Sequence, residues 1–309
     1  MIPMLMHPFM QYAFLAGTAV AAAAGLVGYF LVLRAQVFTG DALSHVAFTG
    51  ALAALAAGLD ARIGLYALTI IVAVTLGAIG RRGRPDDVVI GSVFAWILGL
   101  GVFLLTLYTT TRSGSGNGRA GVSVLFGSIL GLSRNNALLT AVIAVVICAI
   151  LLAMARPLLF ASIDEAVAAA RHVPVRLLGY GFLALAGATA AESTQVVGAL
   201  LILGLLAAPA GAAMQLTARP LVAMGLSAGI AVASVWIGLT AAFHASWMPP
   251  SFAILAVATL SYLIASLARR RPVLLFAGRS GGSPGEAAPT DAGPVPVNTS
   301  TGPADEPST

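Results

Sequence analysis

The sequence predicts an all-α polytopic membrane protein, a bundle of about eight to nine transmembrane helices. Hydrophobic residues make up 59% of the chain and charged residues 9%, whereas an ordinary soluble domain has roughly 25% charged residues. Apolar runs of about 20 residues, long enough to cross a bilayer as helices, recur along the chain. Because lipid offers the backbone no hydrogen-bonding partner, such runs must be helical.

The spacing of the apolar runs places each element. We expect spans at 11–33, 42–59, 63–80, 88–109, 136–155, 177–191, 195–217, 221–243 and 251–268. The segment 120–132 is too short to span and is expected to be re-entrant or a half-helix. Residues 1–278 then form the membrane domain, and 279–309, rich in Gly, Pro, Ser and Thr, form a disordered cytoplasmic tail.

Every basic residue apart from histidine is an arginine, since the sequence contains no lysine. A Walker A phosphate loop needs a lysine to reach the β and γ phosphates, so the chain cannot carry that motif in its usual form. The arginines concentrate in alternate connections, which predicts an external amino terminus and places the connections after the first, third, fifth and seventh spans inside. ATP, if it drives this protein, must be hydrolysed by another chain.

The segment Gly40-Asp-Ala-Leu-Ser-His45 places a carboxylate and an imidazole four residues apart at the start of an apolar run. Positions i and i+4 share one helix face, so Asp41 and His45 can point at one ion. Their oxygen and nitrogen donors suit divalent manganese, iron or zinc better than copper(I). The sequence therefore predicts a transition-metal path. The alternative is a buried polar pair that only holds two helices together.

Other polar and small residues have simpler interpretations. Glu192 falls at a predicted outer helix end, where a solvated charge is expected. His244 is interpreted as an incidental histidine near the outer interface. Gly225 and Gly229 form a small-residue pair typical of close helix contacts.

One connection between spans looks like a docking element for a soluble partner. Ser162-Ile-Asp-Glu165 has the form of a capping box, with Ser162 as the N-cap and Glu165 three residues later. Both Asp164 and Glu165 favour the positive end of a helix dipole. A short helix should follow and end near Arg171, before Val173-Pro174. A solvated connecting helix is the alternative.

Four blocks in order make the chain resemble the permease subunits of the zinc, manganese and iron class of bacterial ABC importers. They are Phe30 to His45, Leu125 to Gly131, Asp164 to Val175, and Val196 to Ala210. The match covers roughly residues 9–268. His172 departs from it, because such permeases usually have glycine there.

The resemblance implies a transport subunit without catalytic residues or a permanently bound cofactor, in a bacterial plasma membrane. It implies two permease copies, identical or related, two cytoplasmic ATP-binding subunits and an extracytoplasmic metal-binding protein. Asp41 and His45 would line the metal path, and two copies would give four ligands. The segment 162–174, with Ser162, Asp164, Glu165, Arg171 and Pro174, would be the coupling helix that contacts the ATPase.

We therefore expect a permease subunit of an ATP-driven importer of manganese, zinc or iron. One alternative is a permease of the iron-siderophore or cobalamin type, and another is an ion-coupled secondary metal transporter that uses Asp41 and His45 as a relay. Membrane lipid is the expected surroundings, and no nucleic-acid partner is expected.

Overall fold

The computed structural model describes residues 7–80, 84–111, 127, 129–199, 202–245 and 247–277, without the side chains of 111 and 270–277. The chain divides into a unit ending at Arg270 and a second beginning at Arg271, of which only the end of one helix is described. The predicted tail 279–309 lies outside the described residues.

The described elements are all helices, as predicted. In chain order they are α2 (Pro8–Leu33), α3 (Val37–Ala57), α4 (Ala61–Ile79), α5 (Asp87–Thr111), η1 (Ile129–Gly131), α7 (Arg134–Ile163), α8 (Glu165–Ala170), α9 (Val175–Val196), α10 (Ile202–Leu216), α11 (Pro220–His244) and α12 (Pro250–Ala277). Nine of these helices coincide with the nine predicted spans. Within the described part, seven are long and apolar enough to cross a membrane, which makes this a multi-pass membrane protein.

The boundary between α9 and α10 differs from the prediction. The apolar pattern placed the end of one span at 191 and the start of the next at 195, but α9 continues to Val196 and α10 begins at Ile202. The reason is that the polar residues after 191 stay inside the bundle as part of α9. Of the segment 120–132, only Gly127, the short η1 turn and Leu132 are described.

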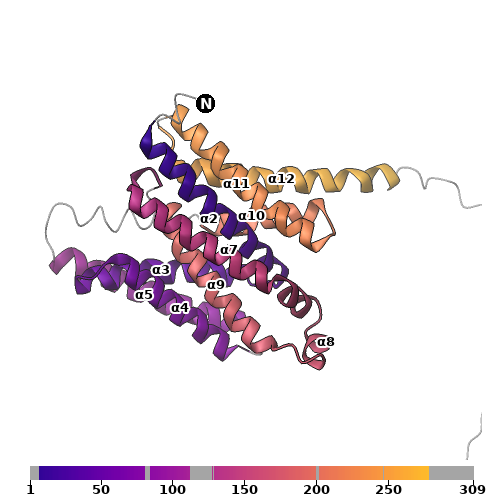
Figure 1. The fold of residues 1–309 in the computed structure, drawn as a ribbon, viewed down its shortest axis with the longest axis horizontal. Coiled ribbons are helices and arrows are strands. Elements are labelled where there is room, and N and C mark those ends of the chain that lie inside the picture. The colour runs from indigo at the N-terminus through magenta and orange to yellow at the C-terminus, as the bar shows by residue number, and fades with distance from the viewer. Residues whose placement is uncertain are drawn as a thin grey trace, which may run out of the picture. The chain divides into compact units, whose positions relative to one another are not determined.

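Helix α2 is the central element of the bundle (Figure 1). It packs against α7, α9, α10 and α11, and most of its residues are buried. Helices α3, α4 and α5 form a second group, in which α3 packs against both α4 and α5. Helix α9 contacts α2 as well as α3 and α4. It therefore joins the two groups.

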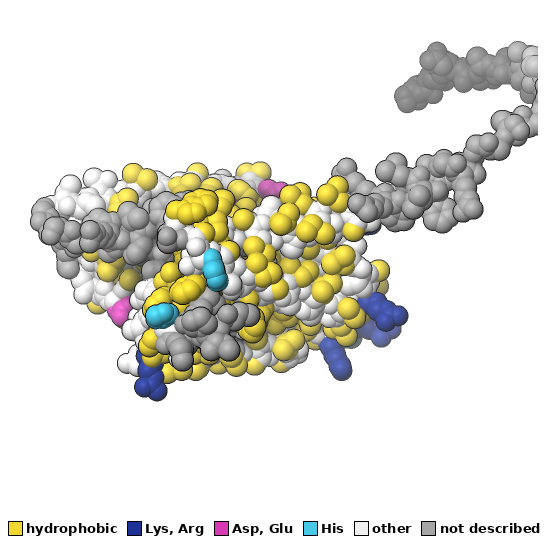
Figure 2. Space-filling view, turned by 90° about the horizontal axis from the view of Figure 1, so that it is seen from above, with side chains coloured by type: hydrophobic (Ala, Val, Ile, Leu, Met, Phe, Trp, Pro, Cys, Tyr) yellow, Lys and Arg dark blue, Asp and Glu magenta, His cyan; other side chains and the backbone are white. Residues whose placement is uncertain are grey.

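The surface of the bundle is apolar. Figure 2 shows one face covered largely by hydrophobic side chains, with arginines gathered toward its edges. Exposed large residues include Trp96 at 68%, Val102 at 66% and Leu177 at 68%. Such exposure would promote aggregation in water but is expected where lipid is the solvent.

Glycines permit the closest helix crossings, but not at the pair that the sequence suggested. Nothing lies within 4 Å of a Cβ built at Gly225 or Gly229, so the prediction of a helix contact there is wrong within this chain. The close crossing joins α3 to α4 instead. A Cβ at Gly50 would overlap the Gly64 carbonyl oxygen, and one at Gly64 would overlap that of Gly50.

We predict that Gly64→Ala destabilises the bundle, because its methyl group would force α3 and α4 apart. Overpacking of this kind costs about 1–3 kcal/mol. Gly99→Ala on α5 is the matched control, since a Cβ there meets nothing within 4 Å. Thermal unfolding of the purified protein in detergent should show a lower midpoint for Gly64→Ala only. Equal midpoints for the two variants would contradict the observed crossing.

Candidate functional site

Asp41 and His45 lie on the one open stripe of the first half of α3. Between positions 37 and 46, only Val37, Phe38, Asp41 and His45 are not buried. Successive positions in this set differ by one, three and four, so the four side chains lie on one side of the helix. The structure thus brings the two predicted ligands together on the accessible side of an otherwise buried helix.

The opposite side of α3 is fixed to the rest of the bundle. The Ser44 hydroxyl lies 2.7 Å from the Asp41 carbonyl oxygen and 3.1 Å from that of Ala199, in the turn after α9. A Cβ at Gly40 would lie 2.9 Å from Leu31 and 3.3 Å from Leu206. The small side chains of Gly40 and Ser44 therefore let α3 approach α2, α10 and the end of α9, which sets the direction of the open stripe.

Phe94 on α5 borders His45 and Phe38. The centroid of the Phe94 ring lies 5.2 Å from that of His45, in an edge-on arrangement, and 5.8 Å from that of Phe38. Asp41 and His45 also interact electrostatically with each other. The aromatic ring excludes water from one side of the imidazole.

This chain places two potential metal-binding side chains, Asp41 and His45, on the stripe. Within the described residues, no group of three or more His, Cys, Asp or Glu side chains could hold one ion. Zinc commonly takes four protein or water ligands, and harder cations take more. Two such side chains alone would leave coordination positions on an ion for other groups.

The segment between α7 and α9 contains the predicted short helix, with a different N-cap. Ser162 belongs to α7, where its hydroxyl donates to the Leu158 carbonyl oxygen at 2.6 Å. The N-cap of α8 is Asp164, whose carboxylate accepts from the Val167 N–H at 2.9 Å. The prediction of a capping box with Ser162 was wrong because α7 continues through that residue. Glu165 becomes the first residue of α8.

The backbone after the end of α8 has an unusual conformation at His172. Arg171 is the C-cap, and Pro174 precedes α9. Between them, His172 has a φ of 60°, in the left-handed region that favours glycine. The resemblance expected glycine at this position. The backbone therefore keeps the conformation that glycine would adopt, although this chain has a histidine there.

Glu192 is not the solvated charge that the sequence suggested. It is 1% exposed, and its carboxylate accepts a hydrogen bond from the Tyr66 hydroxyl of α4. Tyr66 packs beside a small cluster of α3, α4 and α9 residues. No sequence signal pairs these two residues, which are 126 positions apart. The bond ties α9 to α4, and α4 in turn crosses α3.

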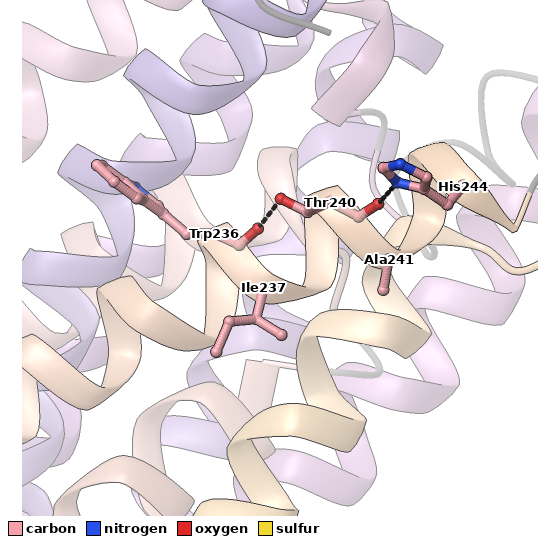
Figure 3. A pocket seen from close by; sticks show the side chains of 5 residues that line it. All are labelled: Trp236, Ile237, Thr240, Ala241 and His244. Carbon is pink, nitrogen blue, oxygen red and sulfur yellow. Dashed lines mark hydrogen bonds between the residues drawn. The ribbon is translucent and has the colours of Figure 1, made fainter. Parts of the chain in front are cut away.

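His244 lies in a separate place, beside a shallow apolar hollow of about 470 Å³ on α11 (Figure 3). Its Nδ1 is 2.9 Å from the Thr240 carbonyl oxygen, which can only accept, so Nδ1 carries the proton. The Trp236 indole N–H donates to the Thr18 hydroxyl at 2.8 Å. Among the described residues that line this hollow, His244 is the one metal-ligating side chain, and its interpretation as an incidental histidine stays a prediction.

The fold is that of a multi-pass membrane protein, and the open stripe of α3 presents one carboxylate and one imidazole. The chain belongs to the ABC 3 transport family, whose model matches residues 6–269. The family agrees with the resemblance found in the sequence.

Named relatives and a solved structure agree with this assignment. The chain is 30% identical over 237 residues to the manganese transport system membrane protein MntC of Halalkalibacterium halodurans, covering 76% of this chain and 79% of that one. It is 30% identical over 204 residues to the chelated iron transport system membrane protein YfeD of Yersinia pestis, covering 66% of each. PsaBC from Streptococcus pneumoniae in complex with Fab has a TM-score of 0.77 at 25% identity, with 89% of this chain and 98% of that chain covered.

We predict that Asp164→Ala loosens α8 and that Ser162→Ala does not. Loss of an N-cap costs about 1 kcal/mol, so the amide of Val167 should exchange with deuterium about fivefold faster in Asp164→Ala. Hydrogen exchange with mass spectrometry measures this locally. Faster exchange in Ser162→Ala, with Asp164→Ala unchanged, would instead support Ser162 as the N-cap of α8.

Proposed function

We propose that this chain is the transmembrane permease subunit of an ATP-driven importer of divalent transition-metal ions, in a bacterial plasma membrane. The observation that carries the proposal is the open stripe of α3, where Asp41 and His45 stand side by side. The relatives named for manganese and iron transport support the class of cargo. The chain itself hydrolyses no ATP in this scheme.

The chemistry of the pair favours a transferable dication. A charged side chain at the centre of a membrane helix costs at least about 2.5–3.5 kcal/mol, so it normally lines a pathway or binds something. One carboxylate oxygen and one imidazole nitrogen suit manganese, iron and zinc. Two ligands from one chain also hold an ion less tightly than a closed structural site, which allows release.

A second permease copy would complete the ligand set. If the open stripes of two copies face each other across a central path, two Asp41 and two His45 side chains supply four ligands. The apolar ring of Phe94 would then line the same path. An extracytoplasmic metal-binding protein would deliver the ion, and its selectivity would contribute to the choice of metal.

Two cytoplasmic ATP-binding subunits would drive the transport. We assign their contact to the segment 162–174, in which α8 projects between the ends of α7 and α9. In this scheme Asp164 stabilises the helix start, Glu165 begins it, and Arg171 and Pro174 form its exit. Movement of α8 would be transmitted to the bundle through α7 and α9, against which it packs.

We predict that Asp41→Asn and His45→Gln each reduce metal uptake by at least about tenfold. Even the loss of a partner outside the first ligand shell costs 10–100-fold in metal affinity or activity, and these residues are direct ligands in the proposal. Uptake of radioactive manganese or zinc, in cells that contain the ATPase and the binding protein, measures the effect at matched protein abundance.

Two control variants replace residues of the same types elsewhere. Asp86→Asn changes an exposed carboxylate next to the start of α5, and His244→Gln changes the histidine of the α11 hollow. Both should transport normally. Full uptake in Asp41→Asn and His45→Gln would show that these two residues are not metal ligands. Uptake that proceeds on an ion gradient without the ATPase would support the secondary transporter instead.

A further inference from the structure

Glu192 is a buried acidic residue to which the proposed function gives no role. Its side chain is 1% exposed, near the end of α9, and its carboxylate accepts a hydrogen bond from the Tyr66 hydroxyl of α4. An acidic side chain inside a membrane bundle is costly and is normally kept for a function, which its partner helps to identify. Here the partner lies on another helix, so the hydrogen bond ties α9 to α4.

The residues next to this hydrogen bond pack against α3. They belong to one small buried cluster, which consists of Ala47 and Ala51 of α3, Leu65 of α4 and Ala191 of α9. Leu65 and Ala191 are the chain neighbours of the two bonded residues, and Tyr66 itself packs against the cluster. Ala47 is two residues after His45. The hydrogen bond therefore lies beside the part of α3 that directly follows the open stripe.

Three contacts connect α3, α4 and α9 to one another. The Ser44 hydroxyl of α3 lies 3.1 Å from the Ala199 carbonyl oxygen, in the turn after α9. Gly50 and Gly64 let α3 cross α4 closely. The hydrogen bond accepted by Glu192 supplies the third connection, between α9 and α4. Because α3 packs against both of these helices, a change in their spacing must shift α3 and the open stripe that it carries.

We propose that Glu192, through its hydrogen bond with Tyr66, is a positioning residue for the metal site. This inference rests on the proposed function, in which Asp41 and His45 bind the ion. The hydrogen bond fixes the spacing of α9 and α4, and these two helices fix α3. The two ligands thereby keep the direction that binding of one ion requires. Loss of the bond weakens metal binding, whereas a purely structural bond would affect only the stability of the fold.

The test measures the binding of manganese(II) to the purified transporter complex, from the electron paramagnetic resonance signal of the ion that stays free. Tyr66→Phe removes the donor of the hydrogen bond, and Glu192→Leu removes the acceptor. Each should raise the dissociation constant by about two- to thirtyfold, the range expected when a residue that does not touch the ligand changes a coupling. The double variant should bind no worse than the weaker single variant, because the two residues act as one unit.

A conservative variant keeps the bond and should restore binding. Glu192→Gln retains a side-chain oxygen that can accept from the Tyr66 hydroxyl. Its dissociation constant should therefore be close to that of the wild type. If Tyr66→Phe assembles poorly, the comparison of Glu192→Gln with Glu192→Leu still decides whether the hydrogen bond matters for the metal site.

A matched control separates positioning from general stability. Ser227→Ala removes another buried hydrogen bond between helices, the one from α11 to the Gly25 carbonyl oxygen of α2. Its thermal unfolding midpoint should fall about as much as that of Tyr66→Phe. Its manganese affinity should match the wild type, because α11 and α2 are not among the three helices that the proposal connects.

The positioning role and the proposed function fail on different results. An unchanged dissociation constant in Glu192→Leu, equally weak binding in Glu192→Gln, or an equal increase in Ser227→Ala would overturn the positioning role. These results leave the proposed function intact as long as His45→Gln weakens manganese binding. Wild-type binding in His45→Gln would overturn the proposed function itself.

Discussion

Each polar side chain inside this bundle needs a specific partner, because neither lipid nor the apolar core can replace water around it. Several of the described residues meet this requirement through contacts with another helix. Glu192 accepts from Tyr66, Ser227 donates to the Gly25 carbonyl oxygen, and Arg34 lies over the Phe182 ring. Each of these contacts joins helices that are distant in sequence. Buried polar groups therefore determine much of the relative placement of the helices, while the apolar residues supply the packing.

Asp41 and His45 stand apart from this pattern. They are half-buried on the open stripe of α3, whereas the other side of the helix is closed by Gly40 and Ser44. The same constraint that demands partners inside the bundle thus leaves this pair facing outward from its own chain, toward whatever completes the site. A fixed helix with one accessible polar stripe is a suitable element for passing an ion along.

The fold could be predicted from the sequence because the apolar runs are long and the bilayer length fixes what they must form. Nine spans coincide with helices, and the short helix α8 lies where the Asp164-Glu165 pattern and Pro174 placed it. Two of the errors have a common cause. Glu192 and the pair Gly225 and Gly229 were interpreted from local spacing, but their environments depend on tertiary contacts. The error at Ser162 is local, because α7 continues through that residue. A periodic pattern identifies a helix face, yet it does not reveal which neighbour covers that face.

In the proposed function, His45 and Asp41 bind the transported ion directly. Electron spin echo modulation of manganese(II) bound to the purified complex tests this binding, because a coordinated imidazole nitrogen gives a characteristic modulation of the echo. This nitrogen signal should be present in the wild-type protein and disappear in His45→Gln, while His244→Gln retains it. A nitrogen signal that persists unchanged in His45→Gln would show that His45 does not bind the ion.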